Sequence, residues 1–363
     1  MTETRAAAPM TTEPSRRTLL RSALAVYAAM LSSQAGAQTK ARMVRDGAGR
    51  SILLPGRVGR VLPAGPPASI LLWSLAPDLT AGWVRRPSPA ELAFLPPEAA
   101  ALPEVGRLTG RDNTANVEAV LAQRPDLVLD YGSVGPTYVS LADRVQAQTG
   151  LPDLLLDGTL ARIPETYALL GEILDLRAAA TVRADAARTI LAEAQAAADT
   201  LRSKGQPSVY YARGPRGLET GLAGSINTEI LEFAGAGNVA ARGLGAGGLA
   251  QVSAEQVLAW DPDWIIAADP RFFAGAPADP VWGTLRAVRT GRLVLAPSVP
   301  YGWIDAPPSV NRLLGLVWLP VLFGAQPADT LEARLADLYG LLFGRRPDPG
   351  QLAPLLRDAM LRH

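Results

Sequence analysis

The sequence predicts an α/β fold in which two lobes are joined by a single long helix. Short apolar runs rich in Val, Ile and Leu alternate with helical patterns along most of the chain, which is the signature of α/β layers. An alanine-rich stretch near the middle has helical spacing and contains neither Gly nor Pro. A short motif occurs once on each side of that stretch, so the chain divides into two related halves.

Composition excludes several classes of function. Of the 363 residues, 48% are hydrophobic and 19% charged, a balance typical of folded proteins. The formal net charge of +1 argues against a nucleic-acid-binding protein. With no cysteine and one histidine, His363, the chain has no disulfide, no Cys/His zinc site and no Ser-His-Asp triad inside the fold. A metal would need oxygen ligands or would arrive inside a chelate.

Residues 1–37 are expected to be a cleaved export signal. The pair Arg16-Arg17, flanked by Ser15 and Arg21, precedes an apolar stretch over 22–31 and the small residues 35–37, as in twin-arginine signals. The apolar stretch is shorter than the roughly 20 residues that span a bilayer. A buried helix with two surface arginines is the alternative. Without a cysteine at the cleavage site for a lipid anchor, we expect a soluble periplasmic protein.

The remaining elements follow from apolar runs bounded by turn residues and from helical spacing that begins near a Pro or a capping residue. In the first half we expect strands at 42–45, 51–54, 58–62, 79–84, 127–131 and 153–156, and helices at 67–75, 117–123, 138–149 and 164–174. In the second half we expect strands at 208–212, 264–268 and 293–296, and helices at 228–234, 254–259, 281–289, 309–322 and 328–343.

The alanine-rich stretch 177–204 is expected to be one helix that ends at Gly205. At 1.5 Å per residue such a helix is roughly 40 Å long, enough to act as a stiff strut across two small domains. It would separate a first lobe, residues 38–176, from a second lobe, residues 205–363. Two ordinary helices meeting near Arg183 are the alternative.

The repeated motif places one glutamate in the first turn of a helix in each half. The segment 116–129 matches 253–266, with Glu, Val, Leu, Ala, Pro and Asp at the same places, and Glu118 and Glu255 are equivalent. Each copy predicts a capped helix, a Pro-Asp turn and a buried strand. The alternative role for the glutamates is local, because a carboxylate near a helix N-terminus stabilises it by roughly 0.3–1 kcal/mol.

Taken together, the motifs resemble a known family, the periplasmic substrate-binding proteins of ABC importers for iron-siderophore complexes, cobalamin and related chelates. The likeness covers essentially all of the chain after the leader. Each segment alone is a weak match, and the order and spacing of the segments make the resemblance specific. The segments are 44–50 followed by Leu54-Pro55, the two copies of the repeat, the 177–204 stretch, 224–239 and 282–293.

The resemblance implies two Rossmann-like lobes, a single connecting helix and a ligand cleft between the lobes. It also implies a monomer that delivers a small-molecule ligand to an ABC permease dimer at the inner membrane. One glutamate on each lobe would dock onto arginines of the permease, and the motif carries this role to Glu118 and Glu255. Two carboxylates at a fixed separation can engage both permease subunits at once.

Ligands of open α/β sheets bind beyond the carboxyl ends of the strands, so the loops there supply the candidate site residues. Some of these residues fit structural roles equally well. Trp303 could pack in the core, Asp305 could cap a helix, and either Tyr210 or Tyr211 could face inward. The candidate ligand-binding residues are Trp83, Arg85, Tyr131, Tyr211, Arg213, Ser225, Asn227, Arg271, Tyr301, Trp303, Asp305 and Arg312.

This set of aromatic, arginine and amide side chains favours an anionic ligand with flat surfaces, such as a ferric siderophore. No further cofactor is expected, and the metal would belong to the ligand. A molybdate or tungstate receptor, using backbone N–H groups at 65–68 and 224–227, and a corrinoid receptor are the alternatives. An enzyme is not expected, because the chain offers neither a convincing pair of carboxylates nor a Gly-x-Ser-x-Gly motif.

Overall fold

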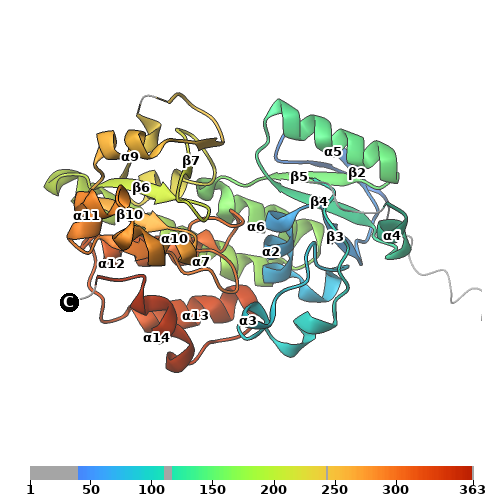
Figure 1. Ribbon diagram of the computed structural model, residues 1–363. Helices are drawn as coiled ribbons and strands as arrows, with labels where there is room; N and C mark the ends of the chain where they lie inside the picture. Colours follow the sequence, from blue (N-terminus) through green and yellow to red (C-terminus); the bar gives the residue numbers. More distant parts are fainter. Residues whose placement is uncertain (1–39, 110–116, 243, 362–363) are drawn as a thin grey trace, which may run out of the picture.

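The computed structural model describes residues 40–109, 117–242 and 244–361. Figure 1 shows two α/β lobes side by side, with helices running between them, so the expected fold class is found. The expected leader, residues 1–37, lies outside the described residues. Among the described helices, none combines the length and the apolar character that crossing a membrane requires.

The first lobe is built on a parallel sheet with the strand order β3-β4-β5. Its register pairs Val61 with Leu127 and Leu129 with Leu154, so the three strands end at one edge. An antiparallel hairpin of β1 and β2 precedes the sheet. The elements are β1 Arg42–Arg45, β2 Ser51–Leu54, β3 Val61–Pro63, α2 Pro66–Leu75, η1 Pro77–Leu79, α3 Pro89–Leu92, η2 Pro97–Ala101, α4 Val117–Ala122, β4 Leu127–Gly132, α5 Pro136–Thr149, β5 Asp153–Asp157, η3 Leu160–Arg162 and α6 Ile163–Ile173.

The second lobe repeats this arrangement around a parallel sheet with the order β11-β10-β6-β8, beside an antiparallel pair of β7 and β9. Apolar residues from both faces of the sheet are buried, as parallel sheets require. The elements are β6 Ser208–Ala212, β7 Glu219–Gly221, α8 Glu229–Phe233, β8 Gly237–Asn238, η4 Val239–Ala241, β9 Leu249–Gln251, α9 Ala254–Trp260, β10 Trp264–Ala267, α10 Pro270–Gly275, η5 Ala276–Ala278, η6 Trp282–Thr284, α11 Arg286–Arg289, β11 Leu293–Leu295, α12 Arg312–Leu322, α13 Leu331–Phe343 and α14 Pro349–Arg357.

The connecting helix α7 is unbroken over Arg177–Lys204 and ends at Gly205, as its pattern predicts. Its buried face consists mostly of alanines, which let neighbouring helices approach closely. A Cβ added to Gly171 of α6 would lie 2.2 Å from the Cβ of Ala180, so glycine is required at that contact. Small residues therefore set the spacing between α6 and α7.

The two lobes also share one hydrophobic core, because the C-terminal helices pack across their base. Buried residues of both sheets and of α2, α7, α12 and α13 belong to a single cluster. The indole of Trp73 in α2 donates a hydrogen bond of 3.3 Å to the carbonyl of Phe343 in α13. The strut α7 is therefore not the only connection between the lobes, and Figure 1 shows α13 and α14 along their lower side.

Three expected elements, the strand at 58–62 and the helices at 309–322 and 328–343, begin three residues later in the structure, at Val61, Arg312 and Leu331. Two others differ more. The segment 79–84 forms only isolated bridges at Thr80 and Trp83, because its first residue, Leu79, belongs to the 3-10 turn Pro77–Leu79. The helix expected over 281–289 is broken at Leu285, whose extended backbone separates η6 from α11. Helices α3, α10 and α14 were not expected, although each begins with a proline that follows a capping Ser or Asp.

Candidate ligand-binding cleft

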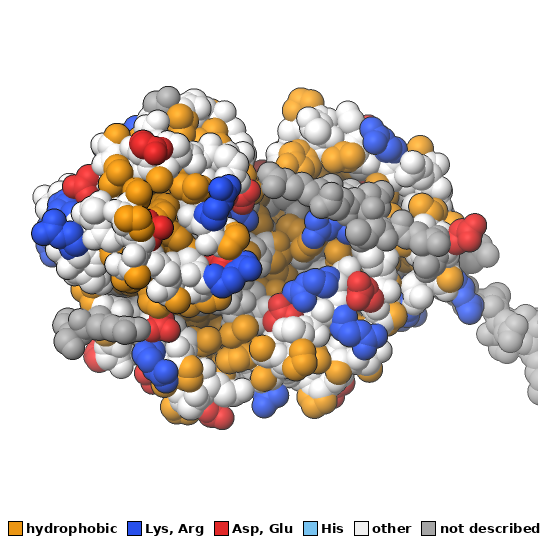
Figure 2. Space-filling model, in the orientation of Figure 1, with side chains coloured by type: hydrophobic (Ala, Val, Ile, Leu, Met, Phe, Trp, Pro, Cys, Tyr) orange, Lys and Arg blue, Asp and Glu red, His pale blue; other side chains and the backbone are white. Residues whose placement is uncertain are grey.

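A cavity of about 490 Å³ lies between the two lobes. Figure 2 shows the hollow between them, with hydrophobic side chains on its floor and cationic side chains at its rim. The first lobe contributes the loops that follow β3 and β4, and the second contributes the loop after β6 and the segment before α12. Six of the predicted ligand-binding residues line it: Trp83, Arg85, Tyr131, Arg213, Asn227 and Tyr301.

The parallel sheets explain why these loops meet. The carboxyl ends of β3 and β4 lie at the same edge of the first sheet, which brings Gly65 next to the Tyr131–Ser133 turn. The end of β6 places Arg213 on the opposite wall. Loops at these strand ends form the usual ligand crevice of open α/β sheets.

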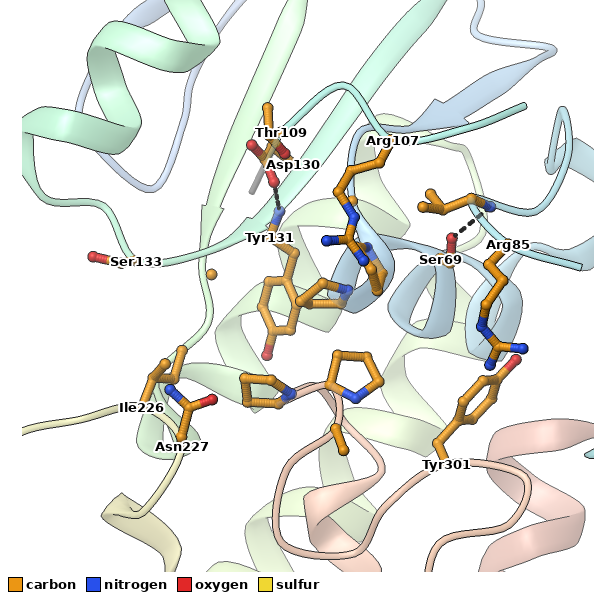
Figure 3. A pocket seen from close by; sticks show the side chains of 18 of the residues that line it. Ser69, Arg85, Arg107, Thr109, Asp130, Tyr131, Ser133, Ile226, Asn227 and Tyr301 are labelled. Carbon is orange, nitrogen blue, oxygen red and sulfur yellow. Dashed lines mark hydrogen bonds between the residues drawn. The ribbon is translucent and has the colours of Figure 1, made fainter. Parts of the chain in front are cut away.

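Two buried tyrosines line the cavity, and within the described part of the chain their hydroxyls have no hydrogen-bond partner of good geometry. They are Tyr131 and Tyr301, which are 1% and 7% exposed. Burial raises the pKa of Tyr131 to about 12, and burial also raises the pKa of Tyr301. Buried polar atoms are rarely left unpaired, and Figure 3 shows the Tyr131 ring reaching into the cavity.

Three arginines line the cavity, from both lobes. The guanidinium of Arg85 makes a two-pronged pair with Glu91, at 3.0 and 2.6 Å. That of Arg213 pairs with Glu219 and lies 3.0 Å from a carboxylate oxygen of Asp305. The third, Arg107, points into the cavity beside Tyr131 in Figure 3. Acidic partners hold the first two guanidinium groups in place, so a ligand meets positioned donors.

The first-lobe wall contains a buried acidic pair, Asp130 and Asp153. Asp130 lines the cavity and accepts the backbone N–H of Tyr131 at 2.9 Å. Asp153, on the neighbouring strand β5, is completely buried, and the nearest cation is Arg50 at 3.8 Å. Burial raises the pKa of Asp130, and burial together with the nearby Asp130 raises the pKa of Asp153 to about 8. The described residues contain no cluster of acidic or histidine side chains that could hold a metal ion.

Not all N–H groups of the two backbone segments that could hold a small oxyanion, 65–68 and 224–227, are available to a ligand. Positions 66 and 67, at the start of α2, are prolines and carry none. In the second segment the N–H of Ser225 bonds the carbonyl of Leu222, and that of Asn227 bonds the hydroxyl of Ser225. Four of the eight positions in the two segments therefore have no N–H group available for a ligand.

The other six predicted site residues lie outside the cavity lining and have other partners. Tyr211 donates to Asp305 at 2.5 Å, and both are buried. Trp303 is in the core, with its indole bonded to the hydroxyl of Tyr339. Ser225 is buried beneath a turn, exposed Arg271 pairs with Asp269, and Arg312 is buried in an ion pair with Glu229.

Several lining residues were missed by the sequence reasoning. Asp130 offered a signal, since it is a charged residue inside an otherwise apolar strand. Arg107 and Thr109 gave none, because no element was predicted near them. Ser133, Pro307 and Pro308 lie between predicted elements and also form part of the wall.

The structure bears out the internal repeat at every matched position. Glu118 and Glu255 are exposed on the short helices α4 and α9, and the valines two residues later are buried. One turn on, Leu121 and Leu258 are 41% and 38% exposed. The equivalence extends to the left-handed residues Arg124 and Asp261, with φ of 49° and 37°, and to Asp126 and Asp263, which accept backbone N–H groups near the start of β3 and β6.

Residues 95–300 match the model of the family described as periplasmic binding protein. No curated protein matches the chain. An ABC transporter solute binding protein from Sulfurospirillum deleyianum is 27% identical, with a TM-score of 0.77, over 87% of this chain and 99% of that protein.

Two further structures share the fold. The molybdate periplasmic binding protein MolA of Haemophilus influenzae, solved with molybdate, is 20% identical, with a TM-score of 0.67, over 85% of this chain and 99% of its own. A protein of an ABC-type Fe³⁺-hydroxamate transport system from Saccharomonospora viridis is 20% identical, with a TM-score of 0.56, over 78% and 99%.

Proposed function

The chain belongs to the periplasmic binding protein family, and from that premise we propose that it is a receptor for a metal chelate, most specifically a ferric siderophore. Proteins of this family deliver small-molecule ligands to the permease of an ABC importer. In this proposal the receptor performs no chemistry on its ligand. The cleft captures the chelate, and the two lobes present it to the permease.

The observation that carries the ligand class is the combination of cavity size and lining. A cavity of about 490 Å³ falls in the range that accommodates drug-sized ligands. Its aromatic side chains and three arginines suit an anionic chelate with flat, partly apolar surfaces. Hydroxamate, catecholate and citrate-type chelates all have oxygen atoms that can accept from the guanidinium groups.

A molybdate or tungstate receptor has less support. A small tetrahedral oxyanion would fill only part of this cavity, and four of the eight positions expected to hold it have no N–H group or bond it within the protein. This chain shares its fold with MolA, but a shared fold does not imply a shared ligand. A corrinoid would extend beyond the cavity. Both alternatives remain outcomes of the binding experiment.

We expect the protein to dock onto its permease through Glu118 and Glu255. Both carboxylates are on exposed helices, and both stand beside an exposed leucine one turn later. Two matching carboxylates, one on each lobe, suit a two-fold permease that offers one cationic site on each subunit. Export through a signal at residues 1–37 completes the proposal, and N-terminal sequencing of the secreted form should begin at Gln38.

The test of the ligand class is a titration of the purified protein, followed by tryptophan fluorescence, against ferric hydroxamate, catecholate and citrate chelates, cobalamin and sodium molybdate. Saturable quenching by one of the ferric chelates alone is the expected result. Arg107→Met should weaken that response, while Arg271→Met, an arginine outside the cavity, serves as the matched control and should leave it unchanged. A response to molybdate but to no chelate would contradict the proposal.

A further inference from the structure

One arginine is as deeply buried as the core tryptophans, and it sits where the two lobes meet. Arg312, the first residue of α12, is completely shielded from solvent. Taking a guanidinium out of water is costly unless each of its donors finds a partner. In this protein its partners come from both lobes.

The guanidinium of Arg312 holds the backbone of both cleft walls. One nitrogen donates to the carbonyl of Gly158, in the first lobe, and another donates to the carbonyl of Ile226, in the second lobe, at 3.1 Å. Its Nε donates to the carbonyl of Ser309 at 3.1 Å. Ile226 itself lines the cavity.

Glu229 completes the connection from the same lobe. Its carboxylate pairs with Arg312 and also accepts the backbone N–H of Leu160, in the first lobe, at 3.0 Å. The two side chains therefore both bind one short segment of the first lobe, residues 158–160, through the carbonyl of Gly158 and the N–H of Leu160. Nearby, the hydroxyl of Ser309 donates to the carbonyl of Pro67 at 2.8 Å, which adds a further bond between the lobes.

The segment 158–160 lies directly against the wall of the cavity. The N–H of Gly158 donates to the carbonyl of Gly132 at 2.7 Å, and a Cβ at Gly158 would come within 2.7 Å of the Cα of Gly132. Gly132 follows Tyr131, whose side chain lines the cavity. Movement of 158–160 would therefore shift Tyr131 relative to Ile226 and Asn227 on the opposite wall.

We propose that Arg312 and Glu229 form a latch between the lobes that sets the width of the cleft and positions Tyr131 opposite the 226–227 wall. They are positioning residues, because neither lines the cavity. The inference goes beyond the proposed function, since it concerns how the walls are held and not which ligand they hold.

The test uses the absence of native cysteine. Spin labels on cysteines introduced at Ala122 and Ala259, which are exposed and equivalent in the two lobes, report the distance between the lobes by double electron–electron resonance. The unliganded parent protein should give one narrow distribution. Arg312→Met and Glu229→Gln should each broaden or shift this distribution. Each should also lower, by about tenfold or more, the affinity for the ferric chelate that quenches the fluorescence of the parent protein. Arg346→Met, which removes an exposed ion pair with Asp337, is the control and should change neither.

A latch predicts that the distance distribution changes, whereas a purely structural role predicts lower stability alone. An unchanged distribution in a folded variant would overturn the proposal, and so would a broadened distribution with unchanged ligand affinity. If Arg312→Met fails to fold, Glu229→Gln decides, because the amide keeps the size of the side chain and an acceptor for Leu160. If no chelate binds, the proposed function fails, and the distance measurement still tests the latch.

Discussion

The phenol of Tyr211 donates a hydrogen bond of 2.5 Å to the buried carboxylate of Asp305, and this bond ties strand β6 to the loop before α12. The other carboxylate oxygen lies 3.0 Å from Nε of Arg213, which lines the cavity. Burial raises the pKa of Asp305, against the opposing effect of Arg213. Tyr211 and Asp305, which were expected to touch the ligand, therefore position Arg213, which lines the cavity.

Tyr211→Phe should lower the free energy of unfolding by about 1–3 kcal/mol, because it removes a hydrogen bond to a fully buried carboxylate. Urea denaturation of the parent and the variant measures the difference. Tyr138→Phe, at a tyrosine that is 43% exposed, is the control and should have little effect. Equal stability of parent and Tyr211→Phe would show that the bond contributes nothing.

Tyr301→Phe should behave in the opposite way. The hydroxyl of Tyr301 is buried without a partner of good geometry among the described residues, so removing it should leave the free energy of unfolding unchanged or raise it. The same change should weaken the binding of a ferric chelate by about tenfold if the ligand accepts from that hydroxyl. Denaturation and fluorescence titration of one variant check both halves, and unchanged binding would remove Tyr301 from the site.

Gly315→Ala should be strongly destabilising. A Cβ at Gly315, in α12, would lie 2.1 Å from the carbonyl oxygen of Trp303, and this backbone contact cannot relax by a rotamer change. We expect a loss of about 1–3 kcal/mol in unfolding free energy. Gly275→Ala is the matched control, because Gly275 is also helical and faces open space, and it should gain up to about 1 kcal/mol. A tolerated Gly315→Ala would mean that the 301–306 loop can move away from α12.

Asp153 should make the protein less stable as the pH rises from about 4 to about 8. Burial and the neighbouring Asp130 raise its pKa in the folded state to about 8, whereas the pKa of an unfolded Asp is about 4. The folded state therefore holds a proton that the unfolded state has released over this range, so the stabilisation is complete at low pH and is lost as the pH increases. Asp153→Asn should flatten the dependence, measured as urea midpoints across the range. A parallel dependence in the variant would contradict this assignment.

The paired change Glu118→Ala and Glu255→Ala should abolish uptake of the chelate and leave ligand affinity intact, since neither residue lines the cavity. Leu121→Ser with Leu258→Ser should weaken transport to a smaller extent if the exposed leucines contact the same permease surface. Transport by reconstituted permease and fluorescence titration separate the two effects. A loss of ligand affinity in the glutamate variant would show that the docking surface is misplaced.

Local patterns determined much of the fold. The boundaries of α7 follow from an alanine-rich face with helical spacing and from Gly205, which ends it. The exposure of Glu118 and Glu255 follows from a repeat whose copies have the same buried and exposed positions. These features depend on neighbours a few residues away, and such neighbours are visible in the sequence.

The tertiary structure alone decided which polar residues reach the ligand cavity. Arg312 and Arg107 are both arginines in the sequence, yet carbonyls brought from distant segments surround Arg312, whereas Arg107 opens into the cleft. Strand alternation could not separate Tyr210 from Tyr211 either, because both faces of a parallel sheet are covered and both rings are buried. The role of Arg312 depends on partners 83 to 154 residues away in the sequence. Packing between the lobes brings these partners together and leaves no local pattern.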